Sequence, residues 1–208
     1  MKRPATDAPA GFTLVEVMIA IGIMTVGSLG ILSMHQAVTR ANREAREMNT
    51  ALAITETWIE RVERDALLWT AQGFNTTELQ ATAYLQTIAG VADETAWFRP
   101  APTLSMESWA FDYFGGDTRT TADTTYCVNL KMSWLRQGSS VRVDIRTYWL
   151  RPGHMTGTPA HSDWVAASAF RGAGCAAGTA DGWNLGSAPN VNVIFASTVV
   201  TWLRRDTP

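Results

Sequence analysis

The longest hydrophobic run of the chain lies near its N-terminus. Residues 11–34 read GFTLVEVMIAIGIMTVGSLGILSM, and Glu16 is the only charged residue among them. A helix rises ~1.5 Å per residue and needs about 20 residues to cross the hydrocarbon core of a bilayer. The pattern therefore predicts a transmembrane helix over residues 12–34. A carboxylate inside such a segment is costly, so Glu16 is a candidate functional residue whose partner must be found.

A second helical pattern follows the apolar run. Between Gln36 and Trp69 the chain contains neither Pro nor Gly, and apolar residues recur at alternating spacings of four and three. This spacing predicts an amphipathic stalk helix over residues 35–72. We expect the apolar stripe to pack on a following sheet, with a homotypic coiled coil or a docked partner subunit as the alternatives. The stripe consists of Met48, Leu52, Thr55, Ile59, Val62, Ala66 and Trp69. Charged residues are expected on the opposite, solvated face, namely Arg43, Arg46, Glu47, Arg61, Glu63 and Arg64.

Residues 73–208 have the pattern of a globular head that ends in strands. Apolar and polar residues alternate on both sides of Gln137-Gly138, which predicts a β-hairpin with one buried face. The fold class is therefore α+β, a long N-terminal α-helix packed on a small antiparallel β-sheet. In chain order, we expect a connection over 73–124 with a short helix at 76–89, the hairpin over 125–150, a loop over 151–189 and a last strand over 190–203.

Charge and residue types exclude several classes of function. A formal net charge of −2 gives no electrostatic footprint for nucleic acid, so no nucleic-acid partner is expected. His154 and His161, even with Asp163 nearby, match no metal-ligand spacing. Neither a nucleophile-elbow pattern nor a P-loop is present. We expect no enzymatic activity, no cofactor and no metal site.

The two cysteines are expected to lie outside the cytoplasm. Lys2 and Arg3 precede the apolar run, and the positive-inside rule then predicts export of everything that follows the run. Disulfides persist in such compartments, and we predict a bond between Cys127 and Cys175, the only cysteines. Two buried thiols or a contact with a partner are the alternatives. Cys127 shares a strand face with Asn129, so it should point away from the main core and towards the loop.

The start of the apolar run has a recognisable pattern. Gly11-Phe12-Thr13-Leu14-Val15-Glu16 resembles the class III leader junction of type IV prepilins. The resemblance implies that a prepilin peptidase removes the leader, residues 1–11, and methylates the new amine of Phe12. Residues 25–30 and Gln36 are most similar to PilV-type minor pilins. A type IV pilin-like fold is implied as well.

The resemblance gives Glu16 a possible partner. Cleavage after Gly11 would create an α-amine on Phe12, which is largely protonated at neutral pH. Within one subunit the two groups meet only if the first helical turn bends back. Between subunits offset along the helix axis, Glu16 of one faces the Phe12 amine of the other. We predict this intermolecular ion pair, which would set the register of assembly. The alternative is a Glu16 that only complements the helix dipole.

The glycines of the apolar run also need a reason, since each costs ~1 kcal/mol relative to Ala in a helix interior. Gly22, Gly27 and Gly30 favour close approach of neighbouring helices through small residues. Local unwinding of the helix during assembly is the alternative.

The expected function is that of a structural assembly subunit. The resemblance implies a minor pilin that assembles into, or primes, a type IV pilus, a filament used in cell adhesion and twitching motility. Its expected partners are other minor pilins, the major pilin, a large tip adhesin and prepilin peptidase. It would sit in the bacterial inner membrane as a single-pass protein with its head in the periplasm, and then reach the cell surface in the pilus. A minor pseudopilin of a type II secretion system and a membrane-anchored module that binds adhesin, sugar or DNA are the alternatives.

Overall fold

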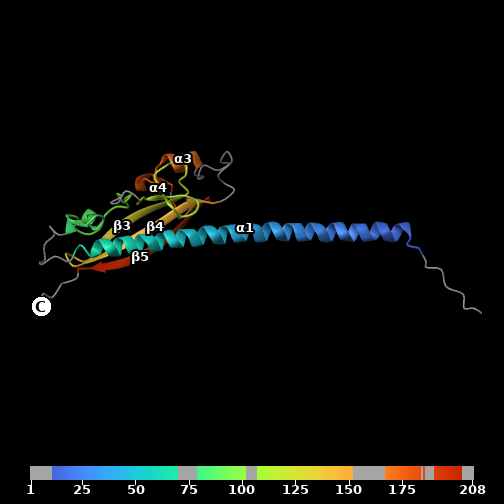
Figure 1. Cartoon of the computed structure of the whole chain (residues 1–208), viewed down its shortest axis with the longest axis horizontal. Coiled ribbons are helices and arrows are strands. Elements are labelled where there is room, and N and C mark those ends of the chain that lie inside the picture. Colours follow the sequence, from blue (N-terminus) through green and yellow to red (C-terminus); the bar gives the residue numbers. More distant parts are fainter. Residues whose placement is uncertain are drawn as a thin grey trace, which may run out of the picture. The chain divides into compact units, whose positions relative to one another are not determined.

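The computed structural model describes residues 11–69, 79–101, 107–151, 167–183, 185 and 190–202. The chain divides into two compact units, Met1–Ala45 and Arg46–Pro208, and helix α1, Leu14–Ala66, contributes residues to both (Figure 1). The upstream part of the expected leader and His154, His161 and Asp163 lie outside the described residues. Each unit is considered by itself below.

The first unit consists of the apolar part of α1. By length and composition this helix could cross a membrane. Its hydroxyl side chains bond to carbonyls of the same helix, with Thr25 Oγ1 2.8 Å from Gly22 O and Ser28 Oγ 2.8 Å from Met24 O. Such internal bonds satisfy polar groups that lipid cannot. The helix continues without a break through its glycines, and a Cβ added at Gly27 would meet no atom within 4 Å. No contact inside the chain therefore requires these glycines.

The second unit contains a five-stranded antiparallel sheet with the strand order β2-β1-β3-β4-β5. Strands β3 and β4 form the hairpin expected from the alternating pattern, and β5 provides the third long strand. Strands β1 and β2 fall in the stretch expected as a connection, and two residues each are too few to produce a periodic signal. The strands are β1, Ala110–Phe111; β2, Asp117–Thr118; β3, Tyr126–Arg136; β4, Ser140–Leu150; and β5, Val191–Thr201.

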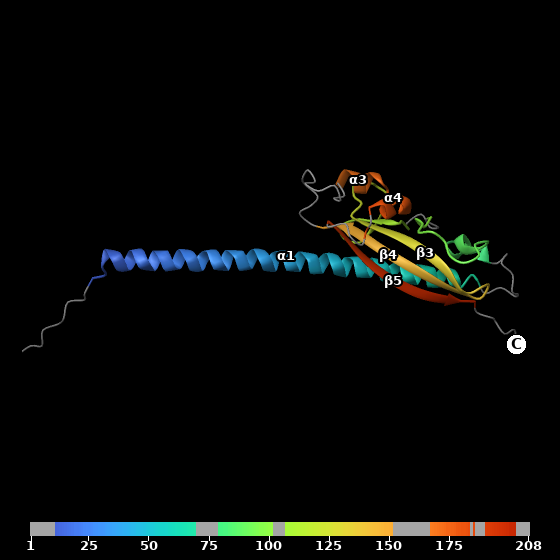
Figure 2. The same ribbon diagram turned by 180° about the vertical axis from the view of Figure 1, so that it is seen from behind.

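The C-terminal part of α1 packs on one face of this sheet, as Figures 1 and 2 show from opposite sides. Trp58 is fully buried in this core, together with the alternating apolar residues of β3 and β4. The expected stripe is correct for Thr55, Val62, Ala66 and Trp69, which are buried. It is wrong for Met48 and Leu52, which are 46% and 44% exposed. The buried face is rotated towards Ala51, Ile54 and Trp58, and it includes charged residues that a search for apolar spacing passes over.

Two charged residues expected on the solvated face are buried, namely Glu47 and Arg61. Arg61 Nη2 lies 2.6 Å from Asp117 Oδ2, and its guanidinium carbon lies 4.9 Å from the centre of the Trp58 ring. Arg61 therefore connects α1 to β2, and its cost of burial is offset by an opposite charge and an aromatic face.

A third α1 residue, Asp65, holds the segment that follows the helix. Its carboxylate accepts hydrogen bonds from the backbone N–H groups of Ala83, Tyr84 and Leu85 at 2.6, 2.8 and 3.0 Å. These bonds orient the 3₁₀-helix η1, Leu85–Ile88, whose Leu85 and Ile88 are buried in the core. Residues 76–78 of the expected short helix at 76–89 lie outside the described residues, and η1 falls in its second half, where tertiary bonds to α1 position it.

The opposite face of the sheet is also buried at one end, which corrects the expectation of a single buried face. Helices α3, Ala167–Gly172, and α4, Ala177–Gly182, cover the end of the hairpin, with Phe170 and Ala180 in a second apolar cluster. Arg146 on β4 reaches α4, where its Nη1 lies 2.5 Å from Asp181 Oδ1. The head therefore has three layers, namely α1, the sheet, and α3 with α4.

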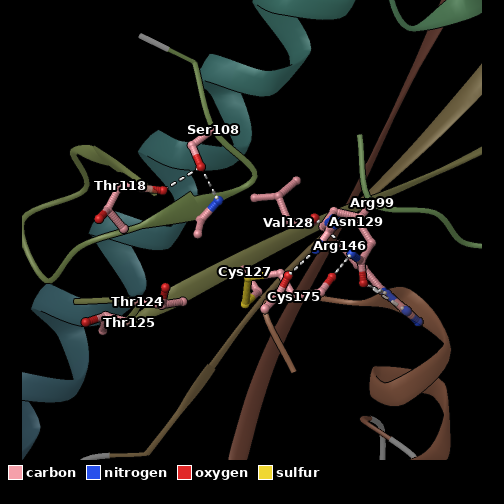
Figure 3. The surroundings of a disulfide bond; sticks show 12 residues. Arg99, Ser108, Thr118, Thr124, Thr125, Cys127, Val128, Asn129, Arg146 and Cys175 are labelled. Carbon is pink, nitrogen blue, oxygen red and sulfur yellow. Dashed lines mark hydrogen bonds between the residues drawn. A yellow bond between two sulfur atoms is a disulfide. The ribbon is translucent and has the colours of Figure 1, made fainter. Parts of the chain in front are cut away.

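The structure contains the disulfide between Cys127 on β3 and Cys175, which precedes α4 (Figure 3). Both cysteines belong to the second apolar cluster, on the sheet face away from α1. This agrees with the prediction that Cys127, which shares a strand face with Asn129, points away from the main core. Asn129 Nδ2 donates to Cys175 O at 2.9 Å, so a hydrogen bond supports the covalent link. The bond closes a separation of 48 residues and ties the α3–α4 layer to the sheet.

The buried tyrosines give the head a predictable response to alkali. Burial, with the nearby Glu47 carboxylate as the next cause, raises the pKa of Tyr126 to about 12. Between about pH 10 and pH 12 the unfolded chain loses this proton while the native state keeps it, so stability present below pH 10 is lost as pH rises. We expect the free energy of unfolding to fall by about 1.4 kcal/mol per pH unit through this group. Urea unfolding at several alkaline pH values should show a shallower fall for Tyr126→Phe, and an equal slope in both proteins would contradict this assignment.

Candidate assembly site at the start of the apolar helix

The residues of the expected cleavage junction form the beginning of α1. The first helical residue is Leu14, and Thr13 stands just before it with its carbonyl accepting the first helical bond, from Val17 N at 3.3 Å. Thr13 Oγ1 accepts from Glu16 N at 3.3 Å. In return, the Glu16 carboxylate accepts from Thr13 N at 2.9 Å. This reciprocal pair is a capping box, in which each side chain satisfies a backbone N–H of the other residue.

The capping box engages only one of the two carboxylate oxygens. Both the backbone N–H and the hydroxyl of Thr13 bond to Glu16 Oε2, at 2.9 and 3.0 Å. Within the described residues, Oε1 has no hydrogen-bond partner, and the Glu16 side chain is exposed. The carboxylate is therefore held in one orientation while one oxygen stays available. A cation approaching from outside could bind there without breaking the cap.

The structure places the other residues that the sequence predicted as functional as follows. Gly11 and Phe12 precede the helix, and Phe12 is 89% exposed. Glu16 bonds to Thr13 and not to Phe12, whose nitrogen is still part of a peptide bond in this chain. Cys127 and Cys175 are joined in the head. The residue missed by the sequence reasoning is Thr13, although the spacing Thr-x-x-Glu before an apolar run is the known signature of a capping box.

Comparison with known families agrees with this junction. Residues 8–32 match the model of the prokaryotic N-terminal methylation motif. The chain carries a prokaryotic N-terminal methylation motif. The match includes Gly11, Phe12, Thr13 and Glu16 and all of the apolar run except its last two residues. No curated protein and no solved structure matches the chain.

The motif and the fold support one another. The α+β arrangement of a long N-terminal helix on a small antiparallel sheet is pilin-like, and the motif is typical of structural subunits of pilin-like and pseudopilin assemblies. In the part of the chain that the structure describes, no group of three or more His, Cys, Asp or Glu side chains could hold a metal ion. The methylation motif marks the start of α1 as the candidate functional site.

Proposed function

We propose that the chain is a minor pilin of the PilV type, which is inserted into, or primes, a type IV pilus. The observation that carries this proposal is the methylation motif over residues 8–32, with Gly11 and Phe12 at the start of an apolar helix. Prepilin peptidase would cut between these two residues and methylate the Phe12 amine. The head would lie outside the cytoplasm, which agrees with the disulfide between Cys127 and Cys175.

Docking would use the carboxylate that the capping box orients. Glu16 Oε2 would keep its hydrogen bonds from Thr13, while Oε1 would accept a hydrogen bond from the charged Phe12 amine of a neighbouring subunit. An oriented carboxylate loses less side-chain entropy on binding than a free one, so the cap favours the pair. The open space at Gly22, Gly27 and Gly30 supports close contact between helices of neighbouring subunits.

A minor pseudopilin of a type II secretion system is the second candidate, because the methylation motif is common to both assemblies. The similarity of residues 25–30 and Gln36 to PilV-type minor pilins favours the pilus. A membrane anchor without assembly is less well supported, since an anchor needs neither the Gly11–Phe12 junction nor a charge at Glu16.

Deletion of the chain from its own cells tests the proposal and separates the two assemblies. We expect a loss of surface pili, at least about tenfold by counting filaments, because the loss of a priming interaction worth about 1.4 kcal/mol already shifts an equilibrium tenfold. Secretion of exported enzymes should stay unchanged. The same cells complemented with the wild-type chain form the control. Normal piliation with impaired enzyme secretion would instead assign the chain to the secretion system.

A further inference from the structure

The sheet of the head has two unlike edges. At one edge, β2 has only two residues, and its Asp117 is bound by Arg61. At the other, β5 runs for 11 residues and, among the described residues, pairs only with β4. It contains no charged residue and no Pro, which are the usual means of blocking an edge against further pairing. The long edge is therefore suited to accept another strand.

The register shows which backbone groups of β5 point outward. Just beyond the paired strands, Arg151 N donates to Asn190 O and Trp202 N donates to Ser139 O. Both bonds follow the same uniform register as the β4–β5 pairs. Bonded pairs alternate along an antiparallel ladder, so the even-numbered residues of β5 bond to β4. The outward N–H and C=O groups belong to Val191, Val193, Phe195, Ser197, Val199 and Thr201.

The side chains of these outward residues lie on the face opposite α1. Phe195 is 61% exposed and Val199 is 52% exposed, while Ser197 between them is exposed as well. Beside them, an open groove of about 490 Å³ is lined by Trp97, Lys131, Arg142, Asp144, Phe195 and Ser197. The charged groups of the groove are already paired, with Lys131 Nζ 2.8 Å from Glu94 and Arg142 Nε 2.8 Å from Asp144. A segment that binds here needs no charge of its own.

We propose that β5 binds an extended, uncharged segment of a different polypeptide, which adds to the sheet as a sixth strand. Its main chain bonds to the outward groups of Phe195, Ser197 and Val199, and its alternate apolar side chains pack beside Phe195 and over the groove. A second copy of this chain fits less well. Strand β5 runs alongside the head part of α1 (Figures 1 and 2), so antiparallel pairing of two β5 strands would point the head parts of the two α1 helices in opposite directions, unlike subunits stacked along one axis. This surface lies on the head, so the inference goes beyond the docking of Glu16.

Photo-crosslinking of the full-length protein in its own cells tests the added strand. The photoreactive residue p-benzoylphenylalanine replaces Val199, and mass spectrometry maps the attached peptide. We expect one adduct, whose peptide is an uncharged run of alternating apolar residues from another polypeptide. Ser197→Pro removes an outward N–H without removing a bond to β4, so the adduct should fall at least about tenfold. Ser197→Ala keeps the N–H and should leave the yield unchanged.

Formation of the Cys127–Cys175 disulfide and the urea midpoint of each variant report whether the head is folded. If Ser197→Pro does not fold, Phe195→Lys places an exposed charge on the edge instead, with Phe195→Leu as its control. Equal yields from the blocking variant and its control would overturn the proposal. An adduct with a second copy of the chain, an adduct with a helical segment, or no adduct would overturn it too.

Discussion

Replacing Glu16 with Ala should remove the chain from assembled filaments while its insertion into the membrane continues. The apolar run of α1 stays intact, and hydrophobic length decides insertion. In the proposed docking, the lost interaction is a charge pair between subunits, and close pairs of this kind are worth about 1.5 kcal/mol or more. We therefore expect the incorporated fraction to fall at least about tenfold, measured by quantitative mass spectrometry of sheared filaments against the membrane fraction.

Glu16→Gln is the variant that separates the two roles of this side chain. Gln preserves the capping box, since its carbonyl oxygen can accept from Thr13 N, but it carries no charge. If the ion pair decides incorporation, Gln behaves like Ala. If Glu16 serves only the helix start, Gln behaves like the wild type, and the register hypothesis is wrong. Intact masses should show N-methylated Phe12 as the first residue of all three proteins, so that a failure of processing is not mistaken for a failure of docking.

Replacing Arg61 with Ala should destabilise the head by about 1.5–3 kcal/mol, because it removes a buried guanidinium together with its hydrogen bonds to Asp117 and to Ser108 O. The Arg61 side chain is 9% exposed and bonds to Asp117 at 2.6 Å, and Arg61 Nη1 also donates to Ser108 O at 3.3 Å. Its guanidinium lies between the rings of Trp58 and Phe111, at 4.9 and 5.7 Å from their centres. Removal therefore opens a space in the core as well as breaking the link to β2. Urea unfolding of the full-length protein in detergent, followed by near-UV circular dichroism, measures the loss.

Arg64→Ala is the matched control for this experiment. Arg64 also bonds to a buried carboxylate, with its Nη2 2.6 Å from Glu107 Oε1, but its side chain is 61% exposed. An exposed ion pair contributes little, so we expect a change below about 1 kcal/mol. Similar small losses for both variants would show that the buried network around Arg61 does not stabilise the head.

Local patterns predicted those elements whose signal lies within a few residues. The apolar run and the alternation of the hairpin could be read from spacing alone, whereas the Gly11–Phe12 junction was inferred from its resemblance to prepilin leaders. The rotation of α1 could not, because Met48 and Leu52 fit the apolar period as well as the residues that are buried. The sheet selects the face around Trp58, where it can also provide Asp117 for Arg61.

The capping box was only partly predictable from the sequence. The spacing of Thr13 and Glu16 is that of a capping box. The partner predicted for the Glu16 carboxylate was nevertheless the Phe12 amine of another subunit, whereas the structure shows bonds to Thr13, three residues before it. The geometry adds that one oxygen of Glu16 is occupied and the other available. A sequence pattern names the residues, whereas only coordinates assign individual atoms.

By itself, the sequence determined a membrane-length helix that carries an N-terminal methylation motif, a β-hairpin and two cysteines suited to a disulfide, since each of these depends on residue type and short-range spacing. Tertiary structure decided which charges are buried, since the pairing of Arg61 with Asp117, and of Asp65 with the amides before η1, joins residues far apart in the chain. It also decided that, among the described strands, β5 forms the long edge of the sheet, because strand order and register follow from how the whole sheet assembles around α1. Burial of polar groups is favourable only where their partners meet them, and that condition is set by the folded chain as a whole.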